Sequence, residues 1–268
     1  MKFEISGKAA FAATGGRPFE ADKPALVMIH GAGMDHTVWT LQARYFAHHG
    51  WSALALDLPN HSGSEGPGLA SIEEMADWVI AAIDAAGAGQ AALVGHSMGA
   101  LIALEAASRL GERALALLML GVVPSMGVHP DLQKAADSGD DSAVETMISW
   151  SFGRRSHIGG NQVPGSWMSG AGFRVLERGL AASLGGDLAA CSAYKGALEA
   201  AAKVSCPALI LSGDEDKMTP AKMVKPLAEV LAKPSVAVLK ACGHMMTIEQ
   251  PDETLDAMRD FLKEAVNG

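Results

Sequence analysis

A serine with glycines two positions before and after it is the first feature of the sequence that could do chemistry. Residues 95–99 carry the letters GHSMG, which match G-x-S-x-G. They follow a short apolar run and open a segment with helical spacing. A sharp strand-to-helix turn needs these glycines, because side chains there would collide with the neighbouring backbone. The turn sets Ser97 at a helix N-terminus, where free N–H groups favour negative charge. We therefore predict that Ser97 is a nucleophile, the alternative being a glycine-rich helix cap.

A serine hydroxyl needs a base, and the base needs an acid to orient it. In a strand-and-helix protein with this turn, the acid and then the histidine follow the serine in the sequence. His244 and Asp216 both come shortly after a predicted strand, at the end where a parallel sheet presents its functional residues. Asp214 and Glu215 stand beside Asp216 and remain alternative acids.

Acyl transfer also needs backbone donors for the negatively charged oxygen of the transition state. One candidate is the N–H of Met98, directly after the predicted nucleophile. The second should come from residues 30–33, HGAG, which follow another apolar run. We predict the Ala32 N–H, with Gly33 as the alternative, and a structural role for His30.

The elements that must position these residues alternate between apolar runs and helical patterns. Alternation of this kind predicts a doubly wound, mostly parallel sheet. Continuous apolar runs between turn residues indicate strands buried on both faces. The first 24 residues predict an antiparallel hairpin that turns at Gly15-Gly16. The expected strands are 25–29, 52–56, 91–94, 115–120, 207–211 and 236–239, and the expected helices are 36–49, 71–86, 98–110, 220–232 and 251–265.

Residues 124–204 break this alternation, because they contain helical patterns and no convincing strand. A structureless loop of this length is uncommon in a compact domain. We expect a helical cap over 124–204, inserted into a core formed by 1–123 and 205–268.

Together, these motifs resemble the α/β-hydrolase-fold esterases along nearly the whole chain. The matching segments are 30–33 with Trp39, 57–64, 95–99, 213–216 and 243–244. The resemblance implies an eight-stranded, mostly parallel sheet with a helical cap between strands six and seven. It also favours Asp216 over Asp214 as the acid. The sequence departs from the family at Asn60 and Ser62, which replace two glycines and put the backbone of that loop in doubt.

The overall composition excludes several kinds of partner. The formal net charge is −9 at pH 7 and no basic cluster is visible, which argues against nucleic acid. The most apolar stretch, 114–123, is far shorter than the roughly 20 residues of a membrane-spanning helix. Scattered histidines and three widely spaced cysteines predict neither a metal site nor disulfides. We expect a cytoplasmic monomer or homodimer with no cofactor, no metal and no membrane partner.

The predicted activity is hydrolysis of small or medium apolar carboxylic esters through an acyl-enzyme intermediate. Adaptable methionines near the predicted site favour irregular apolar ligands. The candidate pocket residues are Gly31, Met126, Trp150, Trp167, Met218 and Met245. Alternatives on the same residues are a lactonase, a thioesterase, a perhydrolase or a carbon–carbon bond hydrolase. The last resembles this chain less, because its usual Gly-Pro-Gly loop is absent. A non-catalytic ligand receptor on the same fold is the alternative from another class.

Overall fold

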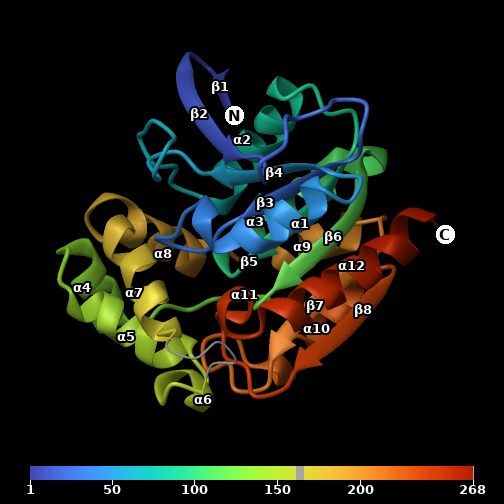
Figure 1. Ribbon diagram of the computed structural model, residues 1–268. Coiled ribbons are helices and arrows are strands. Elements are labelled where there is room, and N and C mark those ends of the chain that lie inside the picture. The colour runs from blue at the N-terminus through green and yellow to red at the C-terminus, as the bar shows by residue number, and fades with distance from the viewer. Residues whose placement is uncertain (161–165, 268) are drawn as a thin grey trace.

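An eight-stranded sheet forms the centre of the molecule, with helices packed around it (Figure 1). The computed structural model describes residues 1–160 and 166–267. The strand order is β1-β2-β4-β3-β5-β6-β7-β8, in which β2 is antiparallel to both neighbours and the other pairs are parallel. The predicted fold is therefore confirmed. The strands are β1 (Lys2–Ile5), β2 (Lys8–Ala13), β3 (Ala25–Ile29), β4 (Ser52–Asp57), β5 (Ala91–His96), β6 (Ala114–Leu120), β7 (Ala208–Gly213) and β8 (Pro234–Leu239).

The inner strands are buried along almost their whole length, as their continuous apolar sequences predict. Strand β8 is different, and the prediction that it is buried on both faces is wrong. Val236 is 50% exposed and Val238 is 42% exposed. The reason is position, because β8 is the last strand of the sheet and pairs only with β7.

The predicted N-terminal hairpin exists, but its turn lies elsewhere. Strands β1 and β2 are joined at Ser6 and Gly7, both with positive φ (51° and 78°), instead of at Gly15-Gly16. Ile5 pairs with Lys8, so the loop has two residues, and two-residue hairpins favour residues with positive φ. Gly15 and Gly16 lie beyond the end of β2.

Helices cover both faces of the sheet. On one side α2, α3, α9 and α10 pack in that order, while α1 packs on β4 and α12 packs on β6 and β8. Ser71 caps α2 by accepting a hydrogen bond from the Glu74 N–H (3.2 Å). Outside the segment between β6 and β7, the helices are η1 (His36–Trp39), α1 (Thr40–Ala47), α2 (Ile72–Ala85), α3 (Met98–Leu110), η2 (Gly111–Arg113), η4 (Ala221–Met223), α10 (Lys225–Val230), α11 (Met246–Glu249) and α12 (Pro251–Asn267).

The single helix predicted over 220–232 is wrong. The segment forms η4 and, after Val224, the short helix α10. Thr219, directly before this segment, donates its hydroxyl to Asp216 Oδ2 at 2.6 Å.

The segment between β6 and β7 is helical, and none of its described residues forms a strand. Figure 1 shows α4 to α8 grouped on one side of the molecule, whereas α9 packs against α3 and α10. Helix α8 ends at Ala193 and α9 begins at Ala197. Residues 161–165, which belong to the predicted cap, lie outside the described residues. The helices are α4 (Pro130–Asp137), α5 (Ser142–Ser151), α6 (Arg154–His157), α7 (Met168–Gly179), the π-helical η3 (Leu180–Leu184), α8 (Gly185–Ala193) and α9 (Ala197–Lys203).

The turn between β5 and α3 is the tightest junction of the core. Ser97 occupies it with φ 55° and ψ −120°, a conformation that non-glycine residues rarely adopt. A Cβ on Gly95 would lie 2.0 Å from the Gly99 carbonyl oxygen, and one on Gly99 would lie 2.2 Å from the Ile29 oxygen. Both glycines are therefore sterically required, as the sequence predicted.

The loop after β4 contains Asn60 and Ser62, the two residues that depart from the glycines of the resembling family. Asn60 and Ser62 hold positive φ angles of 69° and 40°. Asn tolerates this region better than most residues because its short side chain bonds locally or to nearby backbone. Here Asn60 Nδ2 donates to the Ala182 carbonyl at 2.5 Å, and Asp57 Oδ2 accepts from the Gly63 N–H at 2.9 Å.

Over the described ranges 1–160 and 166–267, none of the helices combines the length and the apolar character needed to cross a membrane.

The close approach of α3 to β3 predicts that Gly99→Ala is strongly destabilising. Its Cβ would overlap backbone atoms that cannot move independently, and overpacking of this kind costs about 1–3 kcal/mol or more. We expect the Tm to fall by roughly 5 °C or more, measured by circular dichroism. Gly89→Ala is the matched control, because nothing lies within 4 Å of its added Cβ. Equal Tm values for the two variants would contradict the packing described for α3.

Candidate active site

Three strand ends meet around Ser97. The Ser97 N–H donates to the Leu120 carbonyl at the end of β6 (2.9 Å). From the end of β3, Gly31 approaches so closely that a Cβ there would lie 3.2 Å from the Ser97 Cβ. The carboxyl ends of parallel strands form the functional edge of such a sheet. The predicted nucleophile therefore lies where groups from several loops can reach it.

His244 and Asp216 form a buried pair. His244 Nδ1 lies 2.8 Å from Asp216 Oδ2, and the two side chains are 1% and 0% exposed. Asp216 Oδ1 accepts the N–H groups of Met218 and Thr219, both at 2.8 Å. Burial alone would raise the pKa of Asp216, but His244 and the donated hydrogen bonds hold it well below its usual range. The carboxylate is thus ionised and accepts the Nδ1 proton.

The other nitrogen of His244 is left available. Nε2 is buried and has no hydrogen-bond partner among the described residues. His96, the neighbour of Ser97, contacts His244 with ring centroids 4.7 Å apart and with its Nε2 2.9 Å from the His244 carbonyl oxygen. On another side, a Cβ on Gly121 would lie 2.9 Å from His244 Cε1. These contacts bring the His244 ring to the same strand ends as Ser97.

Burial and the adjacent His244 lower the pKa of His96 to about 3, so His96 remains neutral. It therefore contributes packing and a hydrogen bond beside the site, with no second positive charge.

The loop that carries His244 is held by Glu249, a residue that the sequence did not single out. Glu249 Oε1 accepts the N–H groups on both sides of His244, from Gly243 (3.0 Å) and Met245 (3.2 Å). Its Oε2 accepts from the Gly153 N–H (2.8 Å) and from Ser156 Oγ (2.7 Å). One buried carboxylate thus joins the histidine loop to the start of α6.

The two alternative acids lie away from the histidine ring. Asp214 Oδ1 accepts from the Cys242 N–H at 3.3 Å. Glu215 Oε2 accepts from the Arg154 N–H at 2.6 Å. Of the three carboxylates considered from the sequence, only Asp216 contacts a nitrogen of His244.

The predicted oxyanion donors differ in what their N–H groups already do. The N–H of the alternative donor, Gly33, already donates a hydrogen bond to Asp187 Oδ2 at 2.8 Å. Ala32 lines the same pocket as Ser97. Met98 is the first residue of α3, where N–H groups have no acceptor within the helix. The geometry therefore favours Ala32 and Met98 over Gly33.

His30 has the structural surroundings that the sequence suggested. Its Nδ1 lies 2.9 Å from the Gly31 carbonyl, and its Nε2 accepts from the Leu58 N–H at 3.2 Å. Burial, with His61 nearby, lowers the pKa of His30 to about 4. A neutral His30 therefore ties the β3 loop to the β4 loop.

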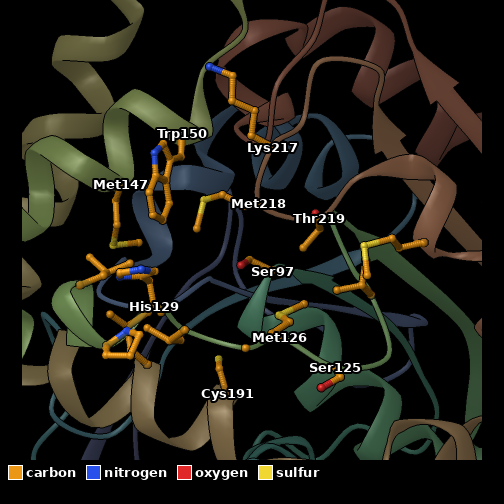
Figure 2. A pocket seen from close by; sticks show the side chains of 18 residues that line it. Ser97, Ser125, Met126, His129, Met147, Trp150, Cys191, Lys217, Met218 and Thr219 are labelled. Atoms are coloured by element: carbon orange, nitrogen blue, oxygen red, sulfur yellow. The ribbon is translucent and has the colours of Figure 1, made fainter.

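A pocket of about 620 Å³ opens over Ser97. Figure 2 shows Ser97 near the centre of the view, with Thr219 on one side, Trp150 and Met147 on the other, and the Met218 side chain between Ser97 and Trp150. Lys217 extends away from Ser97. The lining residues are Ala32, Ser97, Val123, Ser125, Met126, Gly127, Val128, His129, Pro130, Leu132, Met147, Trp150, Leu188, Cys191, Lys217, Met218, Thr219 and Met223. The walls are mainly apolar.

Half of the pocket candidates named from the sequence lie in its lining: Met126, Trp150 and Met218. The other three lie outside this lining. Gly31 is buried against Ser97, Met245 is only 1% exposed in the core, and Trp167 is 73% exposed.

Several wall residues are not among the candidates named from the sequence, although a helical pattern could have found them. Met147 lines the pocket three positions before Trp150 on α5, and Leu188 lines it three positions before Cys191 on α8. Residues at this spacing share one helix face. Knowing which face turned inward required the fold.

Residues 1–160 and 166–267 contain no grouping of three or more His, Cys, Asp or Glu side chains that could hold a metal ion. Cys191, Cys206 and Cys242 are buried free thiols, and burial raises the pKa of each.

Comparisons with known proteins agree with this architecture. The chain is 26% identical over 250 residues to (E)-2-((N-methylformamido)methylene)succinate hydrolase of Acinetobacter baylyi, covering 89% of this chain and 90% of the relative. It is 25% identical over 262 residues to pimeloyl-acyl-carrier-protein methyl ester esterase of Photobacterium profundum, covering 89% and 94%. The enol-lactonase structure from Burkholderia xenovorans superimposes with a TM-score of 0.83 at 20% identity, covering 98% of this chain and 100% of that one. The alpha/beta hydrolase family model matches residues 26–257, and the chain therefore belongs to the alpha/beta hydrolase family.

Proposed function

We propose that this protein is a serine hydrolase that cleaves carboxylic esters of small or medium apolar substrates. The observation that carries the proposal is the buried His244–Asp216 pair. It leaves Nε2 of His244, beside the strained turn at Ser97, without a hydrogen-bond partner among the described residues. A base with one nitrogen fixed by a carboxylate and the other free can take a proton from a hydroxyl.

In the first chemical step, His244 Nε2 takes the proton of Ser97 Oγ while the oxygen attacks the ester carbonyl. The carbonyl oxygen becomes negative and accepts hydrogen bonds from the Ala32 and Met98 N–H groups. Donors that are already in place cost no reorganisation when the charge develops. Asp216 stays ionised, fixes the proton on Nδ1 and stabilises the imidazolium that forms.

The tetrahedral intermediate then collapses. His244 returns its proton to the leaving alcohol, and the acyl group remains on Ser97. Water enters, and its oxygen attacks the acyl carbon while His244 Nε2 removes its proton. The second tetrahedral intermediate then breaks its bond to Ser97 Oγ, His244 returns the proton to that oxygen, and the acid leaves. The same donors stabilise both intermediates.

The pocket supports an apolar acyl or alcohol group. Its volume of about 620 Å³ is within the usual range for small-molecule sites. Methionines from three different segments, Met126, Met147 and Met218, contribute flexible walls. We infer that residues 124–204 act as a cap, because α5 and α8 both contribute to the pocket wall.

Lactone hydrolysis is the second candidate, because a cyclic ester would use the same steps. The Acinetobacter baylyi 3-oxoadipate enol-lactonase 2 is 26% identical to this chain over 256 residues. Open-chain ester hydrolysis is preferred because the pocket is roomy and lined mainly by apolar side chains. A thioesterase, a perhydrolase and a carbon–carbon bond hydrolase remain alternatives on the same residues. Comparing kcat/KM for open-chain esters, lactones and thioesters tests which substrate class is preferred.

A fluorophosphonate probe tests for an activated serine. We expect the folded wild-type protein to gain the mass of one phosphonyl group, with the modified peptide containing Ser97. Ser97→Ala should remain unmodified under the same conditions, as measured by intact-mass and peptide mass spectrometry. If the wild-type protein is folded, its pocket is accessible and Ser97 still remains unmodified, the hydrolase proposal is overturned. A non-catalytic ligand receptor on the same fold would then be favoured.

The acid role can be tested with two neighbouring carboxylates. Asp216→Ala should lower kcat for a p-nitrophenyl ester by about 10³- to 10⁴-fold, because the imidazole loses its orienting anion. His244→Ala should abolish turnover. Asp214→Ala is the matched control, and its kcat should remain within about threefold of wild type. Asp214 contacts the Cys242 N–H and Lys240 but not the His244 ring. Near-full activity in Asp216→Ala would assign the acid role elsewhere.

Two tryptophans test the pocket. Trp150 lines it, whereas Trp167 is 73% exposed and lies outside the lining. Trp150→Ala should raise KM for a medium-chain ester about tenfold, equivalent to about 1.4 kcal/mol. Trp167→Ala should leave KM unchanged, and the reverse pattern would place the acyl group elsewhere. A panel of acyl lengths measured on both variants gives the comparison.

A further inference from the structure

Asp187 is a buried carboxylate where the inserted helices meet the core, and the proposed reaction has not used it. It lies in the first turn of α8 and is 4% exposed. Its Oδ2 accepts the Gly33 N–H at 2.8 Å and lies 2.9 Å from His61 Nε2. Both partners belong to core loops that stand more than 100 residues earlier in the sequence, at separations of 154 and 126.

His61 is surrounded so that it favours a positive charge. Its Nδ1 lies 3.0 Å from the Pro59 carbonyl, and its Nε2 faces the Asp187 carboxylate. Both groups are acceptors only, so each ring nitrogen is best satisfied when it carries a proton. Burial lowers the pKa of His61, but the Asp187 contact outweighs it and raises the pKa overall. The Asp187 carboxyl group thus lies between the His61 ring and the Gly33 backbone N–H.

That backbone donor belongs to the loop that carries the proposed oxyanion group. Gly33 follows Ala32 and has φ 66°, and the Met34 N–H closes the turn on the Gly31 carbonyl at 3.1 Å. Asp187 therefore anchors the peptide directly after Ala32. Since that peptide limits the rotation of Ala32, it also limits where the Ala32 N–H points.

The same loop packs tightly against the inserted helices. A Cβ on Gly33 would lie 2.8 Å from Leu184 Cδ1, and a Cβ on Gly179 would lie 2.1 Å from the Gly33 carbonyl oxygen. The loop therefore contacts η3 and the end of α7 as well as Asp187. Within the part of the chain that the structure describes, only Asp187 supplies a hydrogen-bond acceptor to the Gly33 N–H.

We propose that Asp187 is a positioning residue for the oxyanion loop: by holding the Gly33 N–H, it aims the Ala32 N–H at the developing negative oxygen. The proposal rests on the function proposed above. In this proposal the first turn of α8 positions the oxyanion loop, although Asp187 does not contact the substrate. A donor that acts on the transition state contributes to kcat and little to KM.

The test compares Asp187→Ala, Asp187→Asn and wild type on p-nitrophenyl butyrate. Asp187→Ala should lower kcat about 10- to 100-fold, because a small misplacement or a lost oxyanion donor has effects of this size. KM should stay within about threefold. Asp187→Asn keeps an oxygen that can accept the Gly33 N–H, and should recover to within about fivefold of wild type.

Inhibition by an aryl trifluoromethyl ketone gives an independent readout. The ketone carbon bonds to Ser97 Oγ, the serine proton moves to His244, and the carbonyl oxygen becomes an alkoxide in the oxyanion site. Its inhibition constant should rise in Asp187→Ala by a factor similar to the loss in kcat. A merely structural loss of folded protein would lower the titrated site concentration and leave both constants unchanged.

Arg178→Ala is the matched control. Arg178 forms another ion pair between the inserted helices and the core, with Asp35 Oδ2 at 2.6 Å, but does not contact the Gly33 N–H. We expect its kcat to match wild type. Equal losses in Arg178→Ala and Asp187→Ala would overturn the proposal in favour of general docking of the helices.

The outcomes separate this inference from the proposed function. Wild-type kcat in Asp187→Ala overturns the role of Asp187 while the hydrolase stands. A wild type that neither reacts with fluorophosphonate nor turns over esters overturns the hydrolase itself. If Asp187→Ala does not fold, Asp187→Asn and His61→Gln carry the test, because each keeps a polar group in place. An Asp187→Asn variant slower than wild type by more than about tenfold would contradict the hydrogen-bond role.

Discussion

The close packing of α3 on β3 is the constraint on which the rest of the site depends. Gly99 lies so near the Ile29 carbonyl that no side chain fits between them, and Ser97 adopts its strained conformation at the start of the same helix. A turn of this kind is stable only when the elements on both sides hold it. The continuous burial of β3 and β5 supplies that support. The large apolar core around β3 and β5 thus holds the Ser97 backbone in its strained conformation.

Two buried carboxylates extend this support beyond the core sheet. Glu249 accepts the N–H groups on both sides of His244 and also binds backbone at the start of α6. Glu249 belongs to the core and binds an inserted helix, whereas Asp187 belongs to the inserted helix α8 and binds the core loop after β3. The inserted helices are therefore bonded to two of the loops that surround Ser97. Buried polar groups with several donors rigidify such contacts, and in the proposed account this rigidity is what orients the reacting groups.

The sequence predicted most of what is encoded locally. The strand-to-helix turn at Ser97 follows from two glycines and an apolar run, and the inner strands follow from their continuous hydrophobicity. The sequence-based predictions failed where contacts between residues far apart in the sequence determine the structure. The exposure of β8 depends on its place at the sheet edge, and the face of α5 that carries the missed pocket residue Met147 turns inward because of packing. The Asp187–Gly33 contact joins residues far apart in sequence, so no local pattern reveals it.

A crystal structure of the protein after reaction with a fluorophosphonate would show whether Ser97 reacts with its oxyanion facing the proposed donors. The proposed mechanism predicts phosphorus bonded to Ser97 Oγ and one phosphonyl oxygen about 2.7–3.1 Å from the N–H groups of Ala32 and Met98. It also predicts that the Gly33 N–H still donates to Asp187. An adduct on another side chain, or a phosphonyl oxygen turned away from both donors, would contradict it.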